Sequence, residues 1–172
     1  MLLASRQRAW QFRNFWAIGT MQRLALELMY FTGTRVGDAY RLGHHMVEEG
    51  DLFFKEQKTK KKRQLKIADE LVSIIEATPS HQMVYVVSSK GMPFASAKSF
   101  SQWFVEARKE AGLHMRCVPH GVRKGSGTIA RKNGASNAEL RSIYGCGLAI
   151  RWWNITLAAL SMQRWQLEHS TT

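Results

Sequence analysis

The sequence predicts one α+β domain that is mostly helical and carries a small antiparallel sheet. Three observations lead to this expectation. Apolar residues recur at helical spacing in several segments, two short strand patterns flank a basic turn, and 172 residues suit one domain with a substantial core. A second domain of ordinary size has little room in a chain of this length.

The expected helices carry start and stop signals. They span residues 20–31, 35–42, 69–77, 96–111 and a segment that begins at Pro119. Thr20 is placed as an N-cap of the first helix. In the fourth helix Phe100, Trp103 and Phe104 fall on one face, and Gly112 is placed to end it. We interpret this aromatic stripe as core rather than as a cofactor site.

The strand patterns are short. Residues 52–55 and 64–67 are expected to form a β-hairpin with a lysine-rich tip. Residues 83–87 are an apolar run short enough for a buried strand. Farther along the chain, Ser136 and Glu139 have the spacing of a capping box, which predicts the start of another helix.

The chain is strongly basic, with 25 Lys and Arg residues against 13 Asp and Glu, a net charge of +12 and a pI of about 10.2. A domain this basic usually meets a polyanion, so nucleic acid is the expected partner. A membrane surface is the competing interpretation, but no apolar run approaches the roughly 20 residues that span a bilayer. The N-terminal apolar stretch is also too short for a secretory signal, so we expect a cytoplasmic protein.

The sequence indicates neither a metal site nor a cofactor. Cys117 and Cys146 are the only cysteines and have no CxxC spacing, so we expect ordinary thiols. No HExxH motif and no compact acidic cluster occurs in the sequence. His44 and His45 are adjacent, and because adjacent side chains do not face one another on a helix, we interpret them as structural or exposed.

Three short motifs become informative together. Arg35 follows Thr-Gly-Thr and has Asp38 one turn later, Lys58 lies within QKTKKKR, and His120 and Arg123 lie within HGVRK. Each motif alone is weak evidence. On a helix, His120 and Arg123 share a face, where both can address one phosphate, and Arg35 can supply a second guanidinium. Two arginines suit a reaction at a phosphodiester, because bidentate donors stabilise the non-bridging oxygens of its transition state without a metal.

These motifs together resemble the tyrosine recombinases, also called phage integrases, over about residues 15–145. TGTRVGDAYRL resembles the first-arginine motif of the family, QKTKKKRQLKI its lysine hairpin and HGVRKGSGTIARKNG its HxxR helix. The resemblance implies the fold of the DNA breaking-rejoining enzyme catalytic core. It also implies site-specific recombination of double-stranded DNA through a 3′-phosphotyrosyl intermediate, with other recombinase subunits as partners.

The resemblance also implies residue roles. Arg35 and Arg123 would clamp the scissile phosphate, Lys58 would protonate the leaving 5′ oxygen, and His120 would be its acid/base partner. Asp38 would support the site, although it also suits a simple charge on a helix surface. Lys60 and Lys61 are the alternatives to Lys58 as the general acid. The residues expected to contact DNA directly are Lys60, Lys61, Lys62, Arg63 and Lys124.

The resemblance breaks at Gly145. The family usually continues with Gly-His or Gly-Trp and places its tyrosine nucleophile nine residues after that His or Trp. Here Cys146 follows Gly145, and Ile155 stands nine residues after Cys146. The tyrosines of the chain are Tyr30, Tyr40, Tyr85 and Tyr144. The expected nucleophile is therefore missing.

The genetic code favours a frameshift as the reason. We consider a frame that joins the third base of each codon to the first two bases of the next. Trp152-Trp153 must then encode valine, Trp153-Asn154 must encode glutamate, and Ile155-Thr156 can encode tyrosine. Cys146-Gly147 can encode tryptophan in the same frame, which restores the family ending with correct spacing. The alternative is a divergent tail that permits this reading by coincidence.

We therefore divide the chain into a recombinase-like catalytic domain, residues 1–145, and an aberrant tail without the nucleophile, residues 146–172. Family members generally carry a separate DNA-binding domain before the catalytic one, so the chain resembles a remnant. One hypothesis is DNA strand cleavage and rejoining, inactive in this chain unless a neighbouring subunit supplies the tyrosine. The others are a non-enzymatic DNA-binding protein and a degraded gene product without a role. Whether this chain is itself an enzyme is left open.

Overall fold

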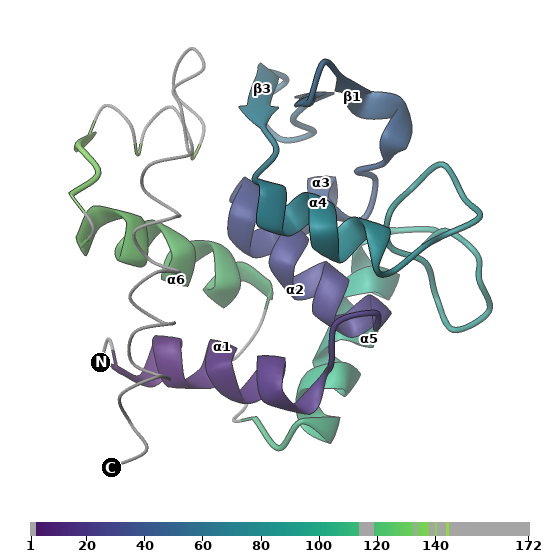
Figure 1. Cartoon of the computed structure of the whole chain (residues 1–172), viewed down its shortest axis with the longest axis vertical. Helices are drawn as coiled ribbons and strands as arrows, with labels where there is room; N and C mark the ends of the chain where they lie inside the picture. Colours follow the sequence, from purple (N-terminus) through teal and green to yellow (C-terminus); the bar gives the residue numbers. More distant parts are fainter. Residues whose placement is uncertain (1–2, 114–118, 133, 138–139, 141–143, 145–172) are drawn as a thin grey trace.

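The computed structural model describes residues 3–113, 119–132, 134–137, 140 and 144. Along the described residues, helices come first, the three strands follow one another, and helices follow again, so the predicted α+β class with a small antiparallel sheet is confirmed (Figure 1). Among the described residues, no helix is both long and apolar enough to cross a membrane. The elements are α1 (Leu3–Phe15), α2 (Met21–Thr32), α3 (Val36–Ala39), the 3₁₀ helix η1 (His44–Met46), β1 (Val47–Glu48), β2 (Asp51–Lys55), β3 (Lys62–Lys66), α4 (Asp69–Glu76), α5 (Ala97–Glu110) and α6 (Pro119–Lys132).

Helix α2 is the centre of the core. It packs against α3, α4, α5 and α6, and its residues from Leu24 to Thr32 are all buried. The predicted cap is present, because the side chain of Thr20 accepts a hydrogen bond from the backbone N–H of Arg23. Gly33 ends the helix with a left-handed φ of 60°, a conformation that favours glycine. The turn that follows leads directly to Arg35.

Helix α1 is an element that the sequence analysis did not predict. The buried ring of Phe12 stacks on Phe104 of α5, with 5.3 Å between ring centroids. Arg13 forms an ion pair of 2.7 Å with Glu27 of α2, and Arg23 forms a second of 2.6 Å with the same buried carboxylate. Among the side chains that the structure describes, Phe12 and Arg13 therefore tie helix α1 to α5 and α2.

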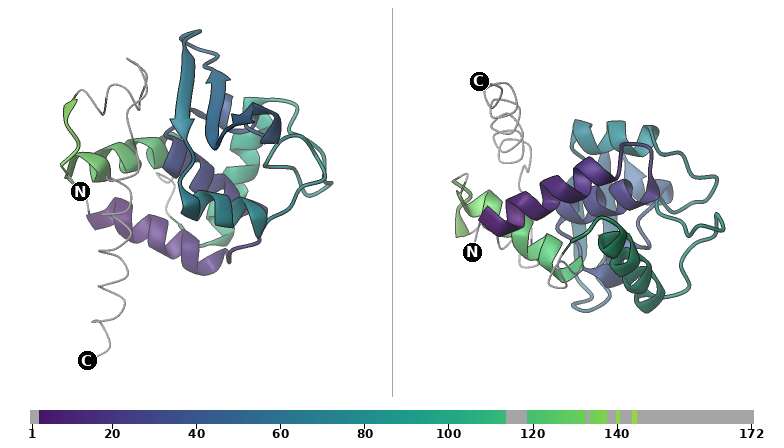
Figure 2. Two further views of the ribbon diagram at one scale, coloured as in Figure 1. Left: turned by 45° about the horizontal axis from the view of Figure 1, so that its top comes forward. Right: turned by 90° about the horizontal axis from the view of Figure 1, so that it is seen from below.

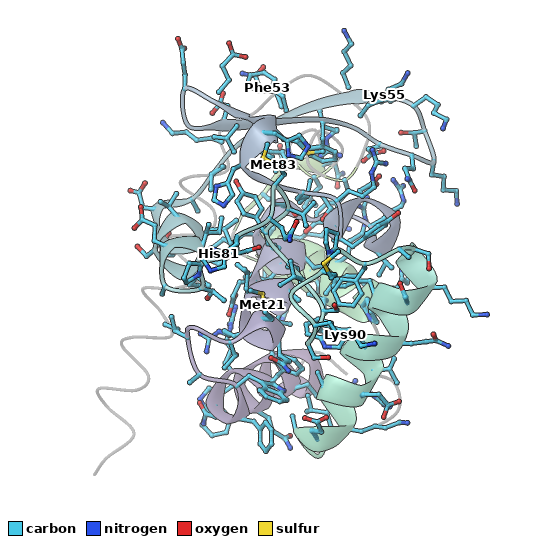
Figure 3. The ribbon with its side chains drawn as sticks, turned by 90° about the vertical axis from the view of Figure 1, so that its right-hand side faces the viewer. Met21, Phe53, Lys55, His81, Met83 and Lys90 are labelled. Atoms are coloured by element: carbon cyan, nitrogen blue, oxygen red, sulfur yellow. The ribbon has the colours of Figure 1, made fainter. Side chains whose placement is uncertain are left out.

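The three strands form an antiparallel sheet in the order β1-β2-β3. The predicted hairpin is present as β2 and β3, with Leu52 opposite Leu65 and Phe54 opposite Arg63. Strand β1 has two residues and gave no separate pattern in the sequence. The hairpin rises above the helices in the left view of Figure 2, and Figure 3 places Phe53 and Lys55 on it at one end of the molecule.

The strand predicted for residues 83–87 is wrong. Only isolated bridges form there, between Gly43 and Val84 and between Val87 and Pro93. The apolar character of the segment reflects burial in a loop, because Tyr85, Val86 and Val87 lie in the core without a neighbouring strand along their length. Periodicity alone cannot distinguish such a buried loop from a buried strand.

The remaining helices differ little from expectation. Helix α3 is shorter than predicted, with four residues. Helix α5 starts at a capping box of Ser96 and Ser99, and Gly112 follows its end with a left-handed φ of 66°. The aromatic stripe of α5 is core, since Phe100 and Phe104 are buried. The capping box expected at Ser136 involves Glu139, which lies outside the described residues.

Candidate functional site

The candidate site is built around Glu56, a residue that the sequence analysis did not single out. Glu56 directly follows β2, and 1% of its surface is exposed. Its Oε2 accepts hydrogen bonds from Arg35 Nη1 at 3.0 Å and from Thr59 Oγ1 at 2.5 Å. Its Oε1 accepts one from Arg63 Nη1 at 2.8 Å. One buried carboxylate therefore holds two guanidinium groups and the hairpin turn.

The hairpin turn is fixed by its backbone and by Asp38. The N–H of Glu56 donates to the carbonyl of Lys61, and the N–H of Lys60 donates to the carbonyl of Glu56, both at 2.9 Å. Asp38 Oδ1 accepts the N–H of Gln57 at 2.9 Å and thereby ties α3 to the turn. Asp38 is buried, so the alternative of a simple surface charge is wrong.

Arg123 approaches the segment of Arg35 from α6. Its side chain is buried, Nη1 donates to the carbonyl of Gly33, and Nη2 donates to the carbonyl of Tyr144 at 2.6 Å. Gly33 lies two residues before Arg35, so helix packing brings the two arginine motifs together. Burial lowers the pKa of Arg123, and the positive charge of Arg35 lowers it further. The two guanidinium groups are thus close enough for their charges to interact.

The electrostatics of the site favour an anion. Burial raises the pKa of Glu56, but the hydrogen bond from Thr59 and the charges of Arg63 and Arg35 lower it by more, so the pKa lies below its ordinary value of 4.5. At neutral pH an ionised Glu56 offsets only part of the charge of Arg35, Arg63 and Arg123. The side chain of Arg35 is 31% exposed, against 5% for Arg63. Arg35 therefore presents this charge to solvent.

Tyr144 is the described tyrosine that contacts Arg123. Its hydroxyl shares a hydrogen bond of 2.7 Å with Ser126 Oγ, and its ring centroid lies 5.1 Å from the Arg123 guanidinium carbon. Burial raises the pKa of Tyr144 to about 12. A hydroxyl that is bonded to α6 and hard to ionise is poorly suited to attack a phosphate at neutral pH.

The two predicted proton-transfer residues lie apart from this network. Lys58 is exposed in the hairpin turn, two residues after Glu56, and His120 is exposed on α6, one turn before Arg123. In the part of the chain that the structure describes, neither side chain makes a hydrogen bond or an ion pair. The structure therefore brings Arg35 and Arg123 together and leaves Lys58 and His120 at the solvent.

The residues predicted to contact DNA divide into two groups. The exposed group consists of Lys60, Lys61, Lys62 and Lys124. Arg63 differs, because alternate residues of β3 point inward and its side chain is buried against Glu56. A direct contact of Arg63 with DNA stays a prediction, and its burial against Glu56 does not favour it. Among the described residues, no group of three or more His, Cys, Asp or Glu side chains could hold a metal ion, and Cys117 and Cys146 lie outside them.

Comparison with known proteins decides the family. The model of the phage integrase family matches residues 9–146. The chain belongs to the phage integrase family. The match contains the motifs of Arg35, Lys58 and Arg123, and it supports a tyrosine recombinase catalytic domain. A search of curated proteins finds no significant match.

Solved integrase structures share the fold of this integrase-family chain. A lambda integrase tetramer bound to a Holliday junction matches with a TM-score of 0.67 and 22% identity, over 83% of this chain and 45% of that one. The lambda integrase catalytic core matches with a TM-score of 0.66 and 20% identity, over 89% of this chain and 95% of that one. XerA recombinase matches with a TM-score of 0.63 and 16% identity, over 98% of this chain and 64% of that one. The chain thus spans less than half of the first of these proteins and nearly all of the isolated core.

Within the candidate site, the sequence analysis did not find Glu56 or the burial of Arg63. The one available signal was an acidic residue at the end of a strand, followed by a run of basic residues. That pattern is typical of any solvated turn. The pairing of Glu56 with Arg35 and Arg63 depends on the register of the hairpin and on the packing of α3 against the turn. Both belong to the tertiary structure and cannot be read from local sequence.

Proposed function

We propose that this chain binds double-stranded DNA at a phosphodiester, as the catalytic domain of a site-specific recombinase whose reaction is strand cleavage and rejoining. The observation that carries the proposal is that Arg123 donates a hydrogen bond to the carbonyl of Gly33, two residues before Arg35, so that both arginines lie at the same turn. Family membership supports the same conclusion. The proposal places the chain in the cytoplasm, with DNA and other recombinase subunits as partners.

The chemistry follows from the donors. Arg35 has an exposed guanidinium, while the carbonyls of Gly33 and Tyr144 accept the hydrogen bonds of Arg123. Both acceptors of Arg123 are neutral, and a charged phosphate oxygen is the stronger acceptor, so DNA can displace one of them. The two forks would then stabilise the charge that grows on the non-bridging oxygens. Lys58 would protonate the leaving 5′ oxygen, and His120 would transfer the other proton.

A nucleophile is the part of this reaction that we propose is missing. Ile155 stands at the expected position, and residues 146–172 contain no tyrosine. Tyr144 has its hydroxyl on Ser126, and burial raises its pKa to about 12, so it does not replace the missing group. We infer that the isolated chain holds DNA without cutting it. This observation favours the second candidate function, DNA binding without chemistry.

The first test is the salt dependence of duplex binding, measured by fluorescence anisotropy. The unaltered chain should bind at low salt and lose affinity steeply as salt rises, because phosphate contacts release counterions. Arg35→Ala should weaken binding and lower the slope of log affinity against log salt by about 1. Lys109→Ala is the control, since Lys109 lies exposed near the end of α5. Equal losses for the two variants, or binding that does not change with salt, would contradict the proposed site.

A further inference from the structure

A second feature of the molecule is a cavity between α1, α2, α5 and α6. Its volume is about 80 Å³, and by the same measure one water molecule needs about 10–15 Å³. There is room for a molecule with several non-hydrogen atoms. Helices α1 and α6, two of the walls, lie near one another in Figure 1 and are in contact. The cavity is distinct from the phosphate site, because neither Arg35 nor Arg123 lines it.

The walls of the cavity are mostly apolar. Side chains from all four helices and from the segment after α5 contribute to them, and the apolar ones include Phe12, Leu26, Phe104, Leu113 and Ile129. Such walls favour an apolar body over a hydrated one. A strongly charged, fully polar anion such as phosphate would lose its hydration against them without adequate replacement.

One wall carries a buried cation. Arg108 of α5 has 4% of its surface exposed, and its Nη1 has no hydrogen-bond partner among the described residues. Its Nε reaches only the carbonyl of Val105 in the same helix, at 3.5 Å, which is the outer limit of a hydrogen bond. None of the described residues that line the cavity is acidic, and Arg8 adds a second basic side chain to the lining. A buried guanidinium for which the described residues provide no counter-ion is unfavourable, so this wall favours a ligand with an acceptor.

We propose that the cavity binds a small monocarboxylate with a compact apolar body. The carboxylate accepts hydrogen bonds from the unpartnered side of the Arg108 fork, for which carboxylate geometry is well matched. The apolar body packs against the rings of Phe12 and Phe104. No covalent step is involved, and the ligand contributes the anion that the described lining does not.

The cavity is linked to the DNA site through α6. Ser126 lines the cavity, and its Oγ shares a hydrogen bond with the hydroxyl of Tyr144, whose carbonyl accepts from Arg123. A ligand in the cavity therefore contacts the helix that carries Arg123. The binding proposal itself does not depend on DNA binding, and the two are tested separately.

The test uses the full chain without DNA and compares benzoate with benzyl alcohol at constant ionic strength. Methyl NMR should show saturable benzoate binding with shifts at Ile129 and Leu26, and weaker binding of benzyl alcohol, which has the same ring without the charge. Arg108→Met should weaken benzoate binding about tenfold or more, because a charged hydrogen bond is lost. The matched control is Lys109→Met, which removes an exposed charge from the adjacent position. It should leave benzoate binding unchanged.

Three results would overturn the proposal. They are no saturable binding of benzoate, equal binding of benzoate and benzyl alcohol, or undiminished benzoate binding by a folded Arg108→Met variant. If circular dichroism shows that Arg108→Met does not fold, the comparison of the two ligands on the unaltered chain decides. Loss of this proposal would leave the DNA proposal intact, since no DNA is present in the experiment.

Discussion

At the scale of single residues, Glu56 decides where Arg35 lies. Its two oxygens bind different partners, so the carboxylate fixes the guanidinium of Arg35 relative to Arg63 and the hairpin turn. The pair is asymmetric in exposure, because Arg63 is buried whereas Arg35 reaches solvent. Arg63 thus anchors the carboxylate, and the carboxylate orients Arg35.

Replacement of Glu56 by glutamine tests this anchoring. Glu56→Gln keeps the shape but removes the negative charge that pairs with the buried Arg63. We expect a loss of about 1–3 kcal/mol in the free energy of unfolding, measured by urea denaturation. Glu106→Gln removes an exposed pair with Lys109 and should cost less than about 1 kcal/mol. Equal free energies of unfolding for the two variants would show that the contacts of Glu56 do not stabilise the fold.

Acid should destabilise the protein by protonating buried carboxylates that are paired with arginines. Burial raises the pKa of Glu27, but Arg13 and Arg23 lower it by more. Burial also raises the pKa of Glu56, but Thr59, Arg63 and Arg35 lower it by more. Both pKa values therefore lie below the ordinary value of 4.5. Such carboxylates contribute stability that is fully present above pH 4.5 and is lost as pH falls through the lower folded values. The free energy of unfolding should therefore fall below about pH 4.5, and less steeply in Glu56→Gln. An equally steep loss of stability below pH 4.5 in the unaltered chain and in Glu56→Gln would contradict this account.

At the scale of elements, the candidate site depends on how three separate segments pack against one another. The turn after α2, the hairpin tip and α6 each contribute one part, and none of them is held by local sequence alone. Repeating apolar spacing and capping residues made α2, α5 and the hairpin predictable. Helix α1 was not, because tertiary contacts of Phe12 and Arg13 hold it.

The loop at residues 83–87 is a second case in which local sequence does not reveal the tertiary structure. Its apolar residues are buried, as the sequence indicates, but burial does not reveal whether a partner strand exists. Arg35 and Arg123 could be assigned to one site from their motifs. The contact of both Arg35 and Arg63 with Glu56 could not be predicted, because a buried acid in a basic turn looks like a solvated one until the register of the hairpin is known.

A glycine tests the loop contact that replaces the expected strand. A Cβ at Gly43 would overlap the carbonyl of Met83, where His44 N–H donates at 3.0 Å. Gly43→Ala should therefore lower the free energy of unfolding by about 1–3 kcal/mol, measured by thermal or urea melts. In Gly37→Ala the nearest neighbour is the flexible side chain of Gln57 at 3.3 Å, so this control should be nearly neutral. A tolerated Gly43→Ala would mean that the bridge to Val84 is dispensable.

At the scale of the whole molecule, the positive net charge supports the proposed DNA partner. The net charge of +12 would attract any stretch of the DNA backbone, while the proposed arginine site would bind one phosphate. The integrase fold extends to the Arg123 helix, and the family match ends at residue 146, close to the place where the sequence ceases to resemble the family. A chain with this pattern should hold DNA well and react with it poorly.

The most direct measurement is covalent trapping on a suicide duplex that carries a nick, followed by denaturing electrophoresis. It compares the unaltered chain with a chain whose reading frame is shifted after Gly145, so that a tyrosine replaces Ile155 and the expected spacing returns. We predict that both chains shift the duplex in a native gel and that only the frame-restored chain yields a protein-linked DNA band, which is lost in its Arg35→Ala variant. A covalent band from the unaltered chain would contradict the claim that this protein keeps the phosphate site and lacks the nucleophile.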